Sequence, residues 1–334
     1  MRFKRSAIPL CFLMFTLMCS SFSSVRSVGA TPNSESSTKV GVYYYVWYGK
    51  GGYGVGRHWN DTIHGIVVDK PLNGYYDSLN VTHVRKQIQL MKDAGIDFVI
   101  ISWWGQGSYE DNATEVWLEA NIAEGCPLQF AIMVELYTKS PNCQYIYNYI
   151  FQNYANQCPT LYLQIGDRFV LCWFNLVPPR NDSRFTDRIV GQKDGMTDWV
   201  YYPELGDNKI SSDGCITVSP RWDNYYLWKY GGVSTYSIHD RNYTEGMYGK
   251  EWQFVLANQY RIKMVIICSW NEYHERTMIE PHFDTSNPDV SLAYTKTVNY
   301  IKELKGIQNA INYISNFMFV PSVGLDKEAP VAAP

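Results

Sequence analysis

The sequence contains few histidines and carries no strong net charge, and both shortages narrow the possible functions. Six His among 334 residues provide few metal ligands, and the His-Glu-x-x-His helix spacing of metalloproteases is absent. A net charge of −3 gives no electrostatic footprint for nucleic acid. We therefore expect no nucleic acid partner, no metal and no other cofactor.

Three further patterns are missing from the chain. It has no Gly-x-Ser-x-Gly sequence for a serine nucleophile. Residues 50–54 are rich in glycine but lack the spacing of a nucleotide-binding loop. Beyond the N-terminal region, no segment has the roughly 20 unbroken apolar residues that span a bilayer. We expect no stable membrane insertion of the mature chain.

Residues 1–30 have the pattern of a signal peptide. Three basic residues lie within the first five positions, and a short apolar stretch follows over residues 8–18. Small residues at 28–30 suit cleavage after Ala30. The pattern predicts a secreted or lumenal protein, with an uncleaved signal anchor as the alternative.

Glycosylation sequons and cysteines bear on the same compartment. Five Asn-x-Ser/Thr sequons favour an exported chain that carries glycans, at Asn60, Asn80, Asn112, Asn181 and Asn242. Six cysteines remain after the signal, and their spacing matches no zinc pattern. Cys172 and Cys268 lie in apolar runs and are expected to be buried thiols. Cys126 and Cys158 each precede a predicted strand, so they could pair at one end of the fold.

Apolar runs alternate with helical patterns along the rest of the chain. Seven runs are predicted strands, at residues 40–48, 97–104, 128–136, 168–173, 198–202, 215–218 and 263–270, with a hairpin leading into the fourth. Five helices are predicted at residues 82–94, 115–123, 143–156, 250–260 and 292–305. Continuous apolar strands separated by helices indicate a parallel sheet. We predict an α/β fold, a single-domain (β/α)8 TIM barrel over residues 38–310 with one strand unrecognised, and a tail over 311–334. A doubly wound open sheet is the alternative, and we expect a monomer.

Aromatic residues are unusually abundant and collect at the predicted strand ends. The chain has 11 Trp and 27 Tyr, and aromatic residues make up 16% of it. Strand ends in a barrel converge on one mouth, where TIM-barrel active sites lie. Flat aromatic faces pack against the apolar faces of sugar rings, and Tyr and Trp add hydrogen-bonding edges. The composition therefore favours a carbohydrate ligand.

The last predicted strand ends in Ser-Trp-Asn-Glu-Tyr-His-Glu, with two carboxylates at Glu272 and Glu275. Burying charge is expensive, so such a cluster at the end of a core strand indicates function. Solvated loop residues are the alternative, as is a metal site built from His274 and the two Glu. Glycoside hydrolysis needs two carboxyl groups with different pKa values, one of which protonates the departing oxygen.

At these residues the chain resembles glycoside hydrolase family 99, the endo-α-1,2-mannosidases and mannanases. The family motif Asn-Glu-Trp-His-Glu-Gly-Thr-x-Ile-Glu-Pro reads here Asn-Glu-Tyr-His-Glu-Arg-Thr-Met-Ile-Glu-Pro over residues 271–281. Other similar segments are Trp-Tyr-Gly at 47–49, His-Trp-Asn at 58–60, Gly-Tyr-Tyr-Asp-Ser at 74–78 and Ser-Trp-Trp-Gly at 102–105. The likeness extends from about residue 40 to 305.

The resemblance implies a (β/α)8 barrel that cleaves internal α-mannosidic linkages with retention and without a metal. In such a family the 2-hydroxyl of the sugar attacks its own anomeric carbon, which gives a 1,2-anhydro sugar. By position, Glu272 would assist the 2-hydroxyl and Glu275 would be the acid/base. The remaining substrate-binding residues implied by the resemblance are Tyr44, Tyr45, Trp103, Trp104, Glu135, Tyr273 and His274.

Three residues depart from the family motif. Tyr273 replaces Trp, Arg276 replaces Gly, and Met278 replaces a polar residue. A cation at Arg276 could lower the pKa of Glu275 or bind an acidic or differently branched glycan. The alternative functions are therefore an endo-hydrolase of another α-glycan, such as an α-glucan, and a non-catalytic carbohydrate-binding protein on the same barrel.

Overall fold

The computed structural model describes residues 38–49, 58–136, 141–191, 197–201, 208–236, 238–239 and 246–306. The predicted signal peptide, the tail over 311–334, the glycine-rich residues 50–54 and the sequon at Asn242 lie outside these ranges. Within the described part of the chain, no helix is both long and apolar enough to cross a bilayer.

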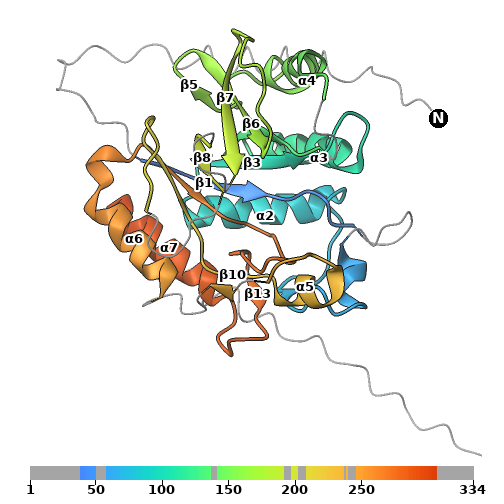
Figure 1. Ribbon diagram of the computed structural model, residues 1–334, viewed down its shortest axis with the longest axis vertical. Helices are drawn as coiled ribbons and strands as arrows, with labels where there is room; N and C mark the ends of the chain where they lie inside the picture. The colour runs from blue at the N-terminus through green and yellow to red at the C-terminus, as the bar shows by residue number, and fades with distance from the viewer. Residues whose placement is uncertain are drawn as a thin grey trace, which may run out of the picture. The chain divides into compact units, whose positions relative to one another are not determined.

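Eight parallel strands form a nearly closed barrel (Figure 1). In chain order they are β1 (Lys39–Tyr44), β3 (Phe98–Trp103), β4 (Gln129–Val134), β6 (Arg168–Phe174), β7 (Phe185–Gly191), β8 (Trp199–Val200), β9 (Cys215–Val218) and β12 (Met264–Ile267). Consecutive strands in this order pair in parallel, except β8 and β9, and β12 pairs with β1. Between β8 and β9, Thr217 Oγ1 donates a hydrogen bond to the Val200 carbonyl. A doubly wound sheet would reverse its strand order, so the predicted (β/α)8 barrel is confirmed.

The strand that the sequence pattern did not reveal is β7. Its sequence, Phe-Thr-Asp-Arg-Ile-Val-Gly, is interrupted by polar residues, so it does not read as a continuous apolar run. Asp187 is buried there and accepts hydrogen bonds from Trp173 Nε1 (2.6 Å) and Tyr147 Oη (2.9 Å). Arg188 reaches outward to Asp213 at 2.7 Å. Polar residues are therefore accommodated by specific partners rather than by solvent.

The main helices are α2 (Val81–Ala94), α3 (Tyr109–Ala123), α4 (Cys143–Ile150), α5 (Tyr225–Gly231), α6 (Met247–Ala257) and α7 (Leu292–Leu304). A π-helical turn, η3 (Phe151–Ala155), extends α4, and two 3-10 turns are η2 (Trp59–Thr62) and η4 (Gln259–Arg261). Asn80 and Ser108 cap α2 and α3 by accepting backbone N–H groups. The prediction missed α5, and it started α3 six residues late. The connection between β6 and β7, residues 175–184, contains no helix.

Three two-stranded pairings complete the fold. Strand β5 (Gln164–Ile165) forms the predicted hairpin with β6. Strand β2 (Lys70–Pro71) pairs with β13 (His282–Phe283), and β10 (Trp222–Asp223) pairs with β11 (Ile238–His239). The β2–β13 pairing joins the segments that follow β1 and β12, whereas β10 and β11 both lie in the connection between β9 and β12.

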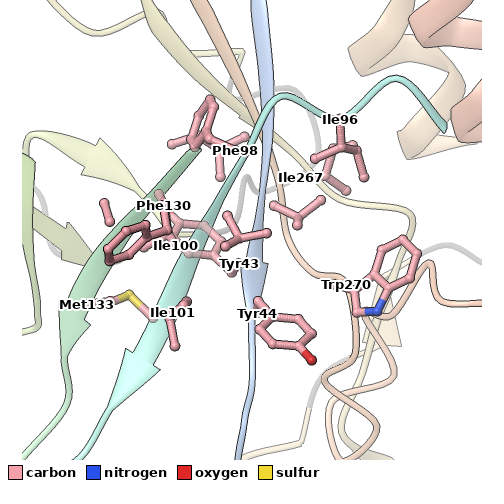
Figure 2. Close-up of a cluster of buried hydrophobic side chains, with 14 of the residues drawn as sticks. Tyr43, Tyr44, Ile96, Phe98, Ile100, Ile101, Phe130, Met133, Ile267 and Trp270 are labelled. Carbon is pink, nitrogen blue, oxygen red and sulfur yellow. The ribbon is translucent and has the colours of Figure 1, made fainter. Parts of the chain in front are cut away.

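Buried apolar side chains of neighbouring strands fill the fold (Figure 2). Tyr43 of β1, Ile100 of β3 and Phe130 of β4 are fully buried. Gly41 allows a close approach between β1 and β3, because a Cβ there would lie 2.2 Å from the Phe98 ring. Burial on this scale fixes the strands, and with them the positions of the residues at their ends.

The six described cysteines are all free thiols. The predicted pairing of Cys126 with Cys158 is therefore wrong for this structure. Cys126 lies just after α3 and Cys158 just after η3, and both are half-buried. Cys172 and Cys268 are fully buried, as their apolar surroundings predicted.

Candidate active site

A pocket opens where the barrel strands end, and it holds a dense group of aromatic and acidic side chains. Its volume is about 360 Å³. The lining residues come from loops after β1, β4, β8 and β12, from the end of β6, and from α5: Tyr45, Trp47, His58, Asp61, Ile66, Glu135, Phe174, Tyr201, Leu227, Gly231, Glu272, His274 and Glu275. The carboxyl ends of parallel strands converge here, as the strand-end aromatics predicted.

Glu272 is buried, and hydrogen-bond donors surround its carboxylate. Oε1 accepts from the backbone N–H of His274 (3.3 Å) and lies 3.0 Å from Nδ1 of the same residue. Oε2 accepts from the backbone N–H of Glu275 at 2.6 Å. Ser269 Oγ in turn accepts from the Glu272 N–H at 2.9 Å and fixes the turn. Two backbone N–H groups and one imidazole nitrogen therefore face the Glu272 carboxyl oxygens.

His274 links Glu272 to a second acid, Asp61. Its Nε2 lies 2.8 Å from Asp61 Oδ2, so each ring nitrogen faces a carboxylate. Burial alone would lower the pKa of His274, but hydrogen bonds to Asp61 and Glu272 raise it to about 9. Hydrogen bonds from His274 and His58 hold the pKa of Asp61 well below its usual range. At neutral pH the ring is therefore an imidazolium that donates to both acids.

The surroundings of Glu275 disfavour its charged form. Loss of solvent raises its pKa well above the usual value, and the nearby charges of Glu272 and Glu135 act in the same direction. Burial also raises the pKa of Glu135 to about 8, against a hydrogen bond from Ser102. Oε1 of Glu135 has no hydrogen-bond partner among the described residues. Four acids, Asp61, Glu135, Glu272 and Glu275, thus line one pocket, and the pKa is lowered at Asp61 but raised at Glu135 and Glu275.

Aromatic and amide groups frame these acids. The hydroxyls of Tyr45 and Tyr201 are hydrogen-bonded to each other. The Asn271 amide accepts from the Tyr45 N–H (2.8 Å) and donates to the Tyr45 carbonyl (2.7 Å), which joins the β12 loop to the end of β1. The Trp47 ring lies 4.4 Å from the Tyr45 ring, centroid to centroid. The Tyr45 and Trp47 rings therefore line the pocket next to the carboxyl groups.

The structure brings together five of the nine predicted site residues in the pocket lining: Tyr45, Glu135, Glu272, His274 and Glu275. Trp104 lies one layer out, with its ring 6.2 Å from Trp47 and its Nε1 donating to Ser102 Oγ. The other three are absent from the lining. Tyr44 donates to Gln87 of α2, and Trp103 Nε1 donates to Asp111 of α3 at 2.7 Å.

Tyr273 lies outside the pocket lining and contacts Glu280. Its hydroxyl and that of Tyr76 each donate to Glu280 Oε2 at 3.0 Å, while Gln87 donates to Oε1 at 2.9 Å. Burial raises the pKa of Glu280 to about 7 despite these donors. The acid of the Ile-Glu-Pro segment therefore holds the turn from beneath rather than facing the pocket.

Arg276 does not face Glu275, which corrects the two effects expected of it. It is buried, and its guanidinium pairs with Asp69 (2.7 Å), Asp223 (2.7 Å) and Asp284 (3.1 Å). Its φ of 55° lies in the left-handed region that favours glycine, so these ion pairs offset a backbone cost. Burial raises the pKa of Glu275, so the expected lowering by Arg276 is wrong, and three acids pair with the Arg276 charge instead.

Asp223 is part of the same buried ion network and lies outside the pocket lining. Arg221 completes the network, with contacts to Asp69 (2.9 Å) and Asp284 (2.6 Å). This network anchors the loops after β9 and β12 on the segment that follows η2.

One group in the pocket could hold a metal ion. Ligand atoms of His58, Asp61 and His274 all lie within 4.8 Å of one another. Both ring nitrogens of His274 already face carboxylates, so a metal would have to displace its proton and the contact with Asp61. The alternative ligand set of His274 with Glu272 and Glu275, considered from the sequence, is not the set that lies together among the described residues.

Sequence reasoning missed several pocket residues. Asp61 and Ile66 follow the His-Trp-Asn segment, which marked the region without indicating the acid. Phe174 ends β6 and Tyr201 follows β8, so strand-end position could have identified both. Leu227 and Gly231 lie on α5, which the pattern did not predict.

Solved structures of other proteins have a fold similar to the one described above. No protein family model and no curated protein matches the chain. Two solved structures of the family 99 endo-α-mannosidase from Bacteroides thetaiotaomicron are similar, one of them a complex with bis-tris propane. They are 17% and 16% identical, with TM-scores of 0.63 and 0.62, and each match covers 80% of this chain and 97% of the other. A glycoside hydrolase-like protein is 14% identical with a TM-score of 0.54, over 84% of this chain and 97% of its own.

Proposed function

We propose that the protein is a retaining endo-acting glycoside hydrolase that cleaves internal α-mannosidic linkages through a 1,2-anhydro sugar. One observation carries this proposal: two carboxyl groups lie in one aromatic pocket with contrasting surroundings. Glu272 accepts two backbone N–H groups and faces the imidazolium of His274, while loss of solvent raises the pKa of Glu275. A base and an acid are thereby ready before substrate binds.

In the first step Glu272 takes the proton of the sugar 2-hydroxyl, and that oxygen attacks the anomeric carbon. The glycosidic bond breaks as Glu275 donates its proton to the departing oxygen, which leaves a 1,2-anhydro sugar. In the second step Glu275, now a carboxylate, takes a proton from water, and the water oxygen attacks the anomeric carbon while the bond from that carbon to the 2-oxygen breaks. Glu272 returns its proton to the 2-oxygen. Two inversions give net retention.

The His274 imidazolium supports Glu272 in this scheme. By donating to Oε1 it favours the ionised base before reaction, and Asp61 holds the ring in place from the other side. Tyr45, Trp47 and Phe174 provide the apolar faces on which a sugar ring can pack.

The substrate class follows from likeness rather than from a bound ligand. The resemblance in the sequence motif and the similar endo-α-mannosidase structures both favour an α-mannoside-containing glycan. We also propose that the protein acts outside the cell or in the lumen of the secretory pathway, as the N-terminal pattern predicts. The asparagines of the four described sequons are exposed, which suits glycosylation.

Oligosaccharide release from α-mannan and from high-mannose glycans tests the proposal. Wild-type protein should release oligosaccharides, and Glu272→Gln and Glu275→Gln should each reduce release at least about 100-fold, the scale of a lost general acid or base. Glu119→Gln, on the exposed face of α3, is the matched control and should behave as wild type. Release that survives both pocket substitutions would overturn the site. Cleavage of α-glucan but not of α-mannan would show that the substrate is an α-glucan. Binding without turnover would favour a non-catalytic carbohydrate-binding protein.

A further inference from the structure

A cluster of exposed aromatic side chains lies on α5 and the turn that follows it. We call this cluster, made of Tyr225, Trp228, Tyr230 and Tyr236, the α5 aromatic patch. Trp228 is 41% exposed, Tyr230 51% and Tyr236 47%. Exposed rings this close together are unusual on a surface that binds nothing, because each ring leaves apolar area in water.

The rings of the α5 aromatic patch are ordered against one another. The Trp228 and Tyr236 rings lie 5.3 Å apart at 33°, and Tyr225 lies 5.5 Å from Tyr236 and 6.1 Å from Trp228. Asn224 Nδ2 donates to the Thr235 carbonyl at 3.1 Å and closes the turn that carries Tyr236. The patch is therefore a preformed surface of rings that contact one another at tilted and edge-on angles.

The patch continues from the catalytic pocket. Leu227 and Gly231, one helical turn apart on α5, line the pocket together with Ile66. A Cβ at Gly231 would lie 2.7 Å from Leu227 and 3.6 Å from Ile66, so α5 packs tightly at the rim. The Tyr230 ring covers Gly65 on the same segment, and Figure 1 shows α5 beside this stretch of chain after β1. Trp228 is one residue from Leu227, so the exposed face starts where the pocket lining ends.

We propose that the α5 aromatic patch is a second carbohydrate-binding surface, which holds a glycan chain where it leaves the catalytic pocket. The proposal rests on the proposed function, because a chain cut internally must extend beyond a pocket of about 360 Å³. Flat rings with polar edges suit the C–H faces and hydroxyls of neutral sugars. Lys229 lies over the Tyr225 and Tyr230 rings at 5.4 and 5.0 Å, so its charge is directed at the rings.

Native electrophoresis in gels that contain α-mannan tests the patch without any need for turnover. On a Glu275→Gln background, which prevents digestion, the protein should be retarded by the polysaccharide. Adding Trp228→Ala or Tyr236→Ala should raise the apparent Kd about tenfold, the effect of about 1.4 kcal/mol. Tyr260→Ala is the matched control, since Tyr260 is 79% exposed on η4 at the opposite ends of the strands. Thermal melting should give the same Tm for all three, because each side chain is exposed.

The outcomes separate the patch from the proposed function. Retardation that is equal in Trp228→Ala and Tyr260→Ala, or absent from both mannan and α-glucan gels, overturns the patch. A Trp228-dependent loss of a dimer in gel filtration also overturns it, because the patch would then bind a second copy. Retardation that needs Trp228 while the wild type releases no oligosaccharide supports the patch and refutes the hydrolase. With an active wild type, Trp228→Ala should raise KM for α-mannan about tenfold relative to KM for a short oligosaccharide.

Discussion

Replacing Asp61 by Asn tests the electrostatic link from Asp61 through His274 to Glu272. The pKa of His274 is about 9, against an ordinary value of 6.5. That difference corresponds to about 3 kcal/mol, since a tenfold change in the protonation equilibrium is worth about 1.36 kcal/mol, and two carboxylates on a buried ring contribute it. Asn keeps the side-chain shape and removes one of the two charges. We expect the pKa of His274 to fall by roughly 1 in Asp61→Asn.

The same change alters how stability depends on pH. A histidine whose pKa is raised by folding stabilises the fold fully below pH 6.5, and this contribution is lost as pH rises through about 9. The wild type should therefore lose about 1.4 kcal/mol more than Asp61→Asn across that window, because the pKa of its His274 is higher by roughly 1.

Two measurements check this prediction. NMR titration of isotope-labelled histidine, with the His274 signal assigned from a His274→Gln variant, reads the pKa directly. Urea unfolding between pH 6 and 10 reads the stability. Asp289→Asn, in an exposed turn, is the matched control and should leave both unchanged. A wild-type His274 pKa at or below 6.5, or one that Asp61→Asn leaves in place, would refute the reasoning.

Three further predictions concern the neighbouring groups. Arg276→Ala should lower the free energy of unfolding by about 3–5 kcal/mol in urea melts, because it leaves buried acids without their cation. Arg85→Ala, which removes one partner of a half-exposed ion pair, should lower it by less than about 1 kcal/mol. Glu135→Gln should keep kcat/KM near the wild-type value at pH 6 and move its alkaline limb to lower pH, because the charge that Glu135 gains as pH passes about 8 raises the pKa of Glu275; an unchanged limb would refute that role. Dialysis against EDTA should leave turnover unchanged, because each proposed proton transfer uses a carboxyl group, and a loss restored by Zn²⁺ would instead support a metal at His58, Asp61 and His274.

The sequence predicted most of the barrel because its strands are buried on both faces. Seven continuous apolar runs therefore stood out, while β7 did not, since Asp187 and Arg188 interrupt it and find partners only in the folded chain. Helix α5 was missed for a related reason: Tyr-Tyr-Leu-Trp-Lys-Tyr-Gly has no side-chain cap and no clear apolar stripe. Local patterns cannot reveal elements whose stability comes from distant contacts.

The site was predictable where strand ends carried it. Glu272, Glu275 and Glu135 follow recognisable strands, so their convergence could be expected. Side-chain direction could not be expected, because neighbouring residues at a strand end face opposite sides. Tyr45 thus lines the pocket while Tyr44 contacts α2. The effect of Arg276 was predicted wrongly because nothing in the local sequence indicated the three distant acids that pair with it.

Activated substrates give the most direct test of the roles assigned to Glu272 and Glu275. An α-mannosyl-mannosyl fluoride needs no protonation of its leaving group. The account predicts that Glu275→Gln still releases fluoride from this compound, because only the acid is lost, whereas Glu272→Gln releases none. Fluoride release by Glu272→Gln together with none by Glu275→Gln would contradict the account.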